Sequence, residues 1–358
     1  LPAAYKRFMA NNNIKFYTIN AVAIAQEIGL GGRINMIMQS AFFKLANIIP
    51  VEDAIKYLKD AVVTSYGKKG EKVVNMNNAA IDKGVESIVE IKIPEAWKDA
   101  KDEEVAPIKN ASDFVKNIVI PMNRQEGDAL PVSTFIGMED GTFEAGTAAF
   151  EKRGIAVNVP EWDSAKCIQC NQCALVCPHA VIRPFLLTET EKNGAPETAK
   201  VVPAKALKTE EPLFYSMGVA PLDCTGCGNC AQVCPAPGKA LVMKPQESQH
   251  NQIEAWDYLM DEVTAKANPM NKNTVKGSQF EQPLLEFSGA CAGCGETPYA
   301  KVITQLFGDR MMIANATGCS SIWGGSAPST PYTKNKEGHG PAWANSLFED
   351  NAEYGLGM

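Results

Sequence analysis

Two runs of cysteines constrain this chain more than any other feature of its sequence. In the first, CIQCNQCALVCP, the thiols begin at Cys167 and are separated by two, two and three residues, with a proline after the fourth. A near copy, CTGCGNCAQVCP, begins at Cys224. Thiols at this density are typical of a metal site or of a disulfide framework. The first question about this chain is therefore whether these thiols bind metal or form disulfide bonds.

The spacing favours iron–sulfur clusters. Three cysteines in a C-x₂-C-x₂-C loop reach three irons of one [4Fe-4S] cube, and the fourth, followed by proline, ligates the other cube. Two such runs predict a ferredoxin-like domain whose clusters exchange their last ligands. We expect one cluster on Cys167, Cys170, Cys173 and Cys234, and the other on Cys224, Cys227, Cys230 and Cys177. His179 follows the first run, but the thiols already complete both sites, so we interpret it as a neighbour.

Zinc and disulfide bonds explain the runs less well. Zinc sites combine two separated C-x₂-C pairs rather than triplets with a fourth cysteine three residues further on. Disulfide frameworks are typical of small secreted domains. This chain has 358 residues, an odd eleven cysteines and no signal-peptide pattern at its start. Two linked clusters favour the transfer of single electrons over a purely structural role.

The charge and hydropathy of the chain argue against binding to nucleic acid and against a membrane span. The formal net charge of −7 argues against a nucleic-acid partner. We find no run of 18 apolar residues, so we expect no membrane span. Cluster-bound thiolates are sensitive to oxygen, and we therefore expect a reducing, cytoplasmic location.

The rest of the chain reads as α/β segments joined by connectors. We expect a strand over 14–19, a helix over 51–66, a second helix over 71–91 and a loop over 27–36. The chain changes character over 96–160, where the charged, proline-bearing stretch 94–110 resembles a linker. The insert between the cysteine runs has a surface loop over 188–200. Residues 246–280 are polar and are interpreted as a connector. The fold class is therefore multidomain α/β and α+β, with a two-cluster ferredoxin-like domain.

A third cysteine group lies near the carboxyl end. Cys291 and Cys294 form a C-x₂-C pair in SGACAGCGETPY, and Cys319 follows in MMIANATGCSS. Thr297 and Pro298 predict the start of a helix, which we expect to end at Gly308. Residues 311–316 predict a strand. The three thiols should then meet at a strand end and a helix start, where α/β sheets hold ligands. A cluster lacking its fourth ligand is favoured over three buried free cysteines.

Several stretches together resemble the pyruvate:ferredoxin (flavodoxin) oxidoreductases of the large single-chain, homodimeric type. They are GLGGRINMIMQSAFFKLA, FEKRGIAVNVPEW, the two cysteine runs, the long stretch from Lys276 that contains CAGCGETPY and NATGCSS, and GPAWANSLFEDNAEYGLGM. The resemblance covers essentially the whole chain. It implies decarboxylation of pyruvate with coenzyme A to acetyl-CoA and CO₂. Electrons would pass from a thiamine diphosphate adduct through three [4Fe-4S] clusters to ferredoxin or flavodoxin.

The resemblance also implies domains and residue roles. It implies residues 1–106 as the end of an α/β domain related to coenzyme A, 107–147 as a linker domain, 148–264 as the ferredoxin-like domain, and 265–358 as the start of a thiamine-binding domain. Cys291, Cys294 and Cys319 would bind the proximal cluster. Glu296 and Cys319 would approach thiamine diphosphate, and Asn35 and Asn77 would contact coenzyme A. No catalytic residue is assigned. For Glu296 the alternative is an acid at a helix start, and for the asparagines it is a helix cap or a surface site.

Three parts of the family pattern are missing here: the amino-terminal pyrimidine-binding domain, the G-D-G motif for diphosphate and Mg²⁺, and the fourth proximal-cluster cysteine. We therefore expect a central segment that works with the rest of its polypeptide and with a second subunit. Two alternatives remain open. One is an oxidoreductase for another 2-oxoacid, and the other is a stand-alone electron-relay module that would not need the third cysteine group.

Overall fold

The computed structural model describes residues 1–102, 108–325, 329–346 and 352–358. It divides into two compact units, Leu1–Pro107 and Ile108–Met358. Within the described residues, no helix is both long and apolar enough to cross a membrane. Helices and short strands occur in both units, which confirms the mixed α/β class that the sequence predicts.

The first unit is built mainly from helices. They are α1 (Ala3–Asn11), α2 (Ala21–Ile28), α3 (Asn35–Ala46), α4 (Val51–Tyr66) and α5 (Glu71–Glu86). Strands β1 (Phe16–Thr18) and β2 (Val89–Ile91) pair antiparallel. The predicted strand over 14–19 and the helix over 51–66 are confirmed. The predicted loop over 27–36 is correct only in its middle, because α2 extends to Ile28 and α3 begins at Asn35. The second predicted helix is shorter than expected, because α5 ends at Glu86 and the chain continues into β2.

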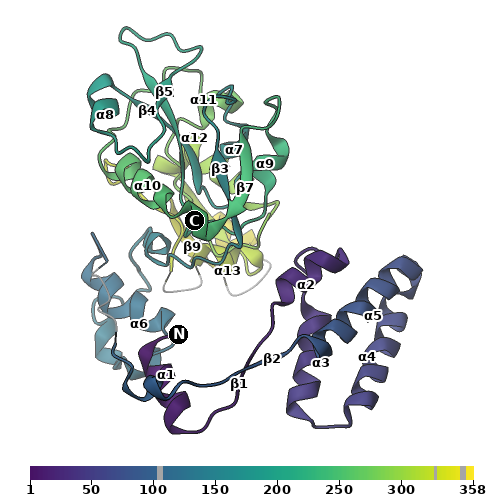
Figure 1. Ribbon diagram of the computed structural model, residues 1–358. Helices are drawn as coiled ribbons and strands as arrows, with labels where there is room; N and C mark the ends of the chain where they lie inside the picture. The colour runs from purple at the N-terminus through teal and green to yellow at the C-terminus, as the bar shows by residue number, and fades with distance from the viewer. Residues whose placement is uncertain (103–107, 326–328, 347–351) are drawn as a thin grey trace. The chain divides into compact units, whose positions relative to one another are not determined.

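Helices α3, α4 and α5 pack against one another, and Figure 1 shows them side by side. Ile37 of α3 and Ala80 of α5 have no exposed surface and belong to the same apolar core. Gly84 allows a close approach between α3 and α5. A Cβ atom at this position would lie only 2.4 Å from the carbonyl oxygen of Ile37. The absence of a side chain at position 84 is therefore what lets the two backbones meet.

The cysteine runs lie in loops and short helices that connect the strands of two small antiparallel sheets. Strand β3 (Asn158–Trp162) pairs with β7 (Leu241–Pro245), and β6 (Phe214–Val219) pairs with both β4 (Ile182–Leu187) and β5 (Val202–Pro203). Each cysteine run enters a short helix, α7 (Gln172–Leu175) in the first and α9 (Asn229–Val233) in the second. The core of this region contains Val159, Trp162, Ile182 and Tyr215 together with three of the cysteines.

Two segments predicted as loop or connector are partly helical. The segment 188–200 contains α8 (Glu189–Gly194), and 246–280 contains α10 (Asn251–Asp261) and α11 (Val275–Ser278). The loop interpretation of 188–200 is wrong because Thr188 and Glu191 form a capping box at the start of α8. The connector interpretation of 246–280 is wrong because α10 buries Trp256 and Leu259 against the sheet.

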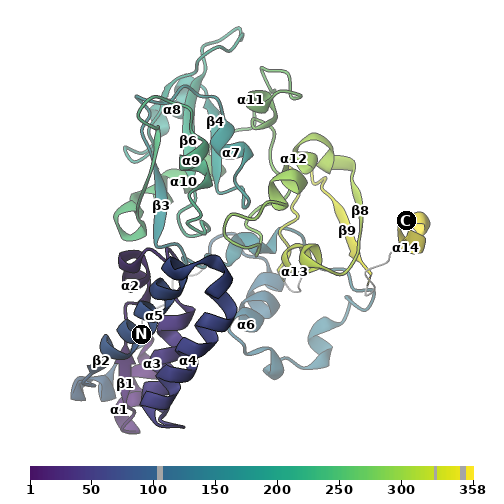
Figure 2. The ribbon, with the colours of Figure 1, turned by 90° about the vertical axis from the view of Figure 1, so that its right-hand side faces the viewer.

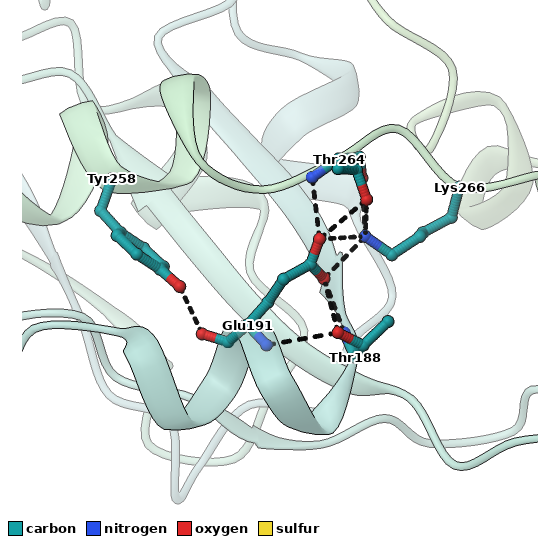
Figure 3. Close-up of polar contacts among 5 residues, drawn as sticks. All are labelled: Thr188, Glu191, Tyr258, Thr264 and Lys266. Atoms are coloured by element: carbon teal, nitrogen blue, oxygen red, sulfur yellow. Dashed lines mark hydrogen bonds and ion pairs between the residues drawn. The ribbon is translucent and has the colours of Figure 1, made fainter.

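Glu191 also joins α8 to the chain that follows α10 (Figure 3). Its carboxylate accepts hydrogen bonds from the Thr264 amide at 2.9 Å and from Lys266 Nζ at 2.7 and 2.8 Å. The hydroxyl of Tyr258 donates to the Glu191 backbone carbonyl. The Glu191 side chain therefore caps α8 and also binds the segment through which the chain leaves the cysteine-rich region.

The remaining elements of the second unit lie before and after this region. They are the π-helical turn Val115–Val119, α6 (Ile120–Asn123), α12 (Thr297–Phe307), β8 (Met312–Asn315), α13 (Cys319–Gly325), β9 (Ala342–Asn345) and α14 (Ala352–Gly357). Strands β8 and β9 are parallel, and Figure 2 shows them side by side. The helix predicted from Pro298 to Gly308 and the strand predicted over 311–316 are confirmed. The helix cap is Glu296, one residue before the Thr297 that we expected.

Candidate metal centre

Eight of the eleven cysteines line two cavities of similar size. The first is lined by Cys167, Cys170, Cys173 and Cys234. The second is lined by Cys177, Cys224, Cys227 and Cys230. Each cavity thus takes three thiols from one run and the last thiol of the other run. These are the same two sets of four that the spacing predicts.

The walls of both cavities are otherwise mostly apolar. Trp162, Met217 and Leu241 line the first cavity, and Val181, Ile182 and Met243 line the second. All of them except Val181, which directly precedes β4, come from strands of the two sheets, so the sheets supply one wall and the cysteine loops supply the other. Apolar walls exclude water and leave sulfur as the main donor facing each cavity.

Backbone conformation explains how each run wraps around its cavity. Gln169 and Asn171 of the first run have φ values of 58° and 61°, and Gly226 and Gly228 occupy the equivalent positions of the second run with 71° and 78°. This left-handed conformation turns successive amides inward. The amide of Gln169 lies 3.3 Å from Cys167 Sγ, and the amide of Gly226 lies 3.3 Å from Cys224 Sγ.

The non-glycine residues of the first run are held in this strained conformation by their side chains. Gln169 donates to the Pro203 carbonyl at 2.9 Å and accepts from the Lys205 amide at 2.7 Å. Asn171 accepts from the Tyr215 hydroxyl at 2.8 Å. Both side chains are buried, so these bonds are formed in a protected environment. Sequence reasoning missed both residues; their alignment with the two glycines of the second run was the available signal.

Burial makes two of the thiols, Cys173 and Cys224, difficult to ionise without a bound cation. Burial raises the pKa of Cys224 to about 12, and the neighbouring charges of Cys177 and Cys227 act in the same direction. Burial also raises the pKa of Cys173 far above its usual value, with Cys167, Cys170 and Cys234 adding to the effect. Thiolates at this density need bound positive charge, so metal binding here would displace protons.

The donor set and its arrangement fit a multi-atom cluster. Among the described residues, no three His, Cys, Asp or Glu side chains converge as they would around a single ion. The thiols are instead distributed around the walls of two small cavities, four on each. Four thiols on an apolar cavity are the donor set of a [4Fe-4S] cluster.

The third cysteine group is more exposed. Cys291 and Cys319 are exposed and Cys294 is partly buried. The Glu296 amide, at the start of α12, lies 3.4 Å from Cys294 Sγ. Burial alone would raise the pKa of Cys294, but hydrogen bonds from Thr297 and Glu296 outweigh it and lower the pKa. The start of α12 therefore favours a thiolate at Cys294.

One hydrogen bond joins the two segments that carry this group. Trp323, four residues into α13 from Cys319, donates from Nε1 to Glu296 Oε2 at 3.2 Å. No hydrogen bond in the described part of the chain joins Cys319 directly to Cys291 or Cys294. The C-x₂-C loop also lies against the second cavity, because a Cβ atom at Gly293 would be 3.5 Å from Cys227 Cβ.

Two buried basic residues lie beside the second cavity. His179 lines it, and its Nδ1 is 3.0 Å from the Ser288 carbonyl, so Nδ1 carries the proton. Burial lowers the pKa of His179. Lys301 of α12 donates to the carbonyl oxygens of Ala174, Leu175 and Cys177. Burial lowers the pKa of Lys301 to about 8, while the charge of Cys177 opposes this change.

Asn35 and Asn77, for which the family resemblance implies contact with coenzyme A, both lie in the first unit, but their surroundings differ. Asn35 is exposed in the first turn of α3. Asn77 is buried on α5, and its side-chain amide donates to the Val73 carbonyl at 2.8 Å. Neither asparagine lines the shallow hollow that this unit forms around Glu71, Asn75 and Met76.

Family models match three parts of the chain. Residues 1–87 match a model described as pyruvate ferredoxin/flavodoxin oxidoreductase. Residues 166–237 match a 4Fe-4S dicluster domain, and 100–156 match a domain of unknown function. The dicluster match contains both cysteine runs, and with the two cavities it shows that this is an iron–sulfur region.

Curated relatives match along the whole chain. A pyruvate-flavodoxin oxidoreductase of Enterobacter agglomerans is 64% identical over 358 residues, and one of Klebsiella pneumoniae is 60% identical over the same length. A pyruvate:ferredoxin oxidoreductase of Moorella thermoacetica is 60% identical over 362 residues. In each case the match covers 100% of this chain and 30% of the relative. The chain therefore spans about 30% of the length of these relatives.

Proposed function

We propose that this chain conducts electrons inside a pyruvate-flavodoxin or pyruvate:ferredoxin oxidoreductase. It is related to these enzymes along its whole length, as its sequence predicts. The whole enzyme would convert pyruvate and coenzyme A to acetyl-CoA and CO₂. Two electrons would leave singly, each reducing one molecule of ferredoxin or flavodoxin. The enzyme would be a homodimer in a reducing cytoplasm.

The two ferredoxin-type clusters carry this proposal. Cys167, Cys170, Cys173 and Cys234 would hold one, and Cys224, Cys227, Cys230 and Cys177 the other. The grouping of these thiols around two apolar cavities is the single observation that supports the assignment most strongly. When bound, such clusters accept and release one electron at a time.

A third cluster on Cys291, Cys294 and Cys319 would adjoin the second cavity. Gly293 lies between two of these cysteines and against Cys227. The cluster that includes Cys177 would therefore be the nearer of the two to the third group, and the cluster that includes Cys234 would be the farther. The fourth ligand is not assigned within this chain.

Thiamine diphosphate would supply the carbanion chemistry when bound. Glu296 and Cys319 remain the residues of this chain proposed to face it, with Mg²⁺ bound by other parts of the enzyme. The bond from Trp323 Nε1 fixes the direction of the Glu296 carboxylate. For coenzyme A, Asn35 is better placed than Asn77, because Asn35 is exposed and the amide of Asn77 bonds within its own helix.

The exchange of ligands between runs is tested with four variants of the full-length enzyme. We expect Cys170→Ser and Cys234→Ser to remove the same EPR signal, although the two residues lie in different runs. Cys227→Ser and Cys177→Ser should together remove the other signal. Each pair is the control for the other. If Cys234→Ser instead removes the signal lost in Cys227→Ser, each run holds its own cluster and the assignment is wrong.

The reaction is tested with the anaerobically purified full-length enzyme. Pyruvate and coenzyme A should together reduce the clusters and produce acetyl-CoA, while 2-oxoglutarate or a branched-chain oxoacid should not. Iron analysis of the same enzyme should give about eight irons per chain for the two ferredoxin-type clusters alone, four per cube. Reduction by another 2-oxoacid but not by pyruvate would contradict the substrate assignment and leave the cluster assignment standing.

A further inference from the structure

A buried cation lies at the backbone that links the two cysteine cavities. Lys301 on α12 is only 1% exposed. Its Nζ donates to the carbonyl oxygens of Ala174, of Leu175 at 3.0 Å and of Cys177 at 3.1 Å. A lysine buried this deeply is rare unless its charge has a specific partner.

The hydrogen bonds show that Lys301 is an ammonium group. All three partners are carbonyl oxygens, which accept and cannot donate. Three donated bonds require three N–H groups, and a neutral amine has only two. Two of the carbonyls belong to the last residues of α7, and that of Ala174 also accepts the Cys177 amide at 3.3 Å. Lys301 thus supplies donors to a helix end while bringing a full positive charge with it.

This charge lies where the two proposed ligand sets meet. The backbone from Cys173 to Cys177 carries the third ligand of one set and the exchanged ligand of the other. Lys301 binds three carbonyls within this stretch, and among the residues that the structure describes none of its hydrogen bonds goes to a carboxylate. By contrast, the nearby buried Arg183 is paired with Glu286. The charge of Lys301 is therefore available to act on the thiolates.

We propose that Lys301 raises the reduction potentials of both ferredoxin-type clusters, and raises more strongly the potential of the cluster that includes Cys177. Each added electron makes a cluster more negative, and a fixed cation in a poorly polarisable interior stabilises that negative charge. The stronger effect on the Cys177 cluster follows from the direct bond between Lys301 and the Cys177 carbonyl. This inference rests on the proposed clusters and adds a positioning residue from α12 that tunes them.

Lys239 provides a matched comparison. Its Nζ also bonds to the carbonyl oxygen of a proposed ligand, Cys234, at 2.7 Å, but Lys239 is exposed. Water and salt screen an exposed charge much more effectively than a buried one. Replacing Lys239 should therefore change the potentials far less than replacing Lys301, even though both residues bond to a ligand backbone.

The experiment is a redox titration of the full-length enzyme followed by EPR, with each signal assigned by the cysteine variants above. Lys301→Gln keeps a donor for the carbonyls but removes the charge, and Lys301→Arg keeps the charge. At fixed ambient potential we expect Lys301→Gln to lower the reduced-to-oxidised ratio of the Cys177 cluster at least tenfold, which is about 59 mV for one electron. The cluster that includes Cys234 should change in the same direction by less.

We expect Lys301→Arg and Lys239→Gln to remain near the wild-type ratio. If Lys301→Gln leaves both ratios unchanged, or if Lys301→Arg lowers them equally, Lys301 is only structural and the inference is wrong. If the Lys301→Gln enzyme does not retain its clusters, the same ratios are measured in Lys301→Met and judged by the same criteria. A wild-type enzyme without two [4Fe-4S] signals would instead overturn the proposed function itself.

Discussion

Replacing Glu191 by glutamine tests how the cysteine-rich region is joined to the chain that follows it. The wild-type carboxylate bonds to Lys266 and to the amide of Thr264, and it closes the capping box with Thr188 (Figure 3). Glutamine keeps the size of the side chain but removes the negative charge. Its NH₂ group would face the ammonium of Lys266 or a donating amide, so part of the network must break.

The magnitude follows from the pKa of Glu191. Burial alone would raise this pKa, but the Lys266 ion pair and the bonds from Thr188 and Thr264 outweigh burial and lower it from 4.5 to about 2. A change of that size corresponds to about 3 kcal/mol of folding free energy. The Lys266 and Glu191 side chains are 16% and 13% exposed, so screening reduces our expected loss to about 1–2 kcal/mol.

The pH dependence has a definite sign. Because the pKa is lower in the folded state, the stabilisation is complete above pH 4.5 and is lost as the pH falls toward 2. The stability gap between wild type and Glu191→Gln should therefore be full at neutral pH and close over that acidic range. The gap is measured from urea midpoints of the full-length enzyme under anaerobic conditions.

A local assay accompanies the stability measurement. Hydrogen exchange at neutral pH should be faster in Glu191→Gln across 258–266, since the Thr264 amide loses its carboxylate acceptor. The control is Glu189→Gln, which alters an exposed acid in the first turn of the same helix. Unchanged urea midpoints together with unchanged exchange across 258–266 would refute the role assigned to Glu191.

Two further predictions concern packing around the cavities. Gly226→Ala should lower the iron content and destabilise the protein by about 2–3 kcal/mol, because its Cβ would lie 3.0 Å from the Asn158 carbonyl. Gly228→Ala, at a similar φ but with open space around it, should cost only about 1 kcal/mol; equal losses in iron content and unfolding midpoint would contradict this reasoning. Arg183→Met should cost about 3–5 kcal/mol, because it leaves the carboxylate of Glu286 buried without its partner. A double change that also replaces Glu286 by leucine should recover part of that loss in a urea-unfolding cycle, and no recovery would show that the packing of Arg183 on Trp256 and Phe287 is what matters.

Local spacing allowed the sequence to predict the cysteine sets. Three thiols in one tight loop can reach only one cube, and the proline after the fourth cysteine ends the loop. The same locality explains why the helix over 51–66 and the helix that follows Pro298 were predicted well. The helix α8 was also readable, since Thr188 and Glu191 have capping-box spacing. Its polar composition hid it among loop residues.

The amino-acid sequence by itself determined the donors, their grouping and the relatives of this chain, because these depend on residues only a few positions apart or on identity along the whole length. Only the tertiary structure decided which distant groups act on those donors. Lys301 meets Ala174 across 127 residues, and Lys266 meets Glu191 across 75. The physical reason is that burial of a charge depends on the packing of whole elements against each other. No periodicity or local spacing records such packing.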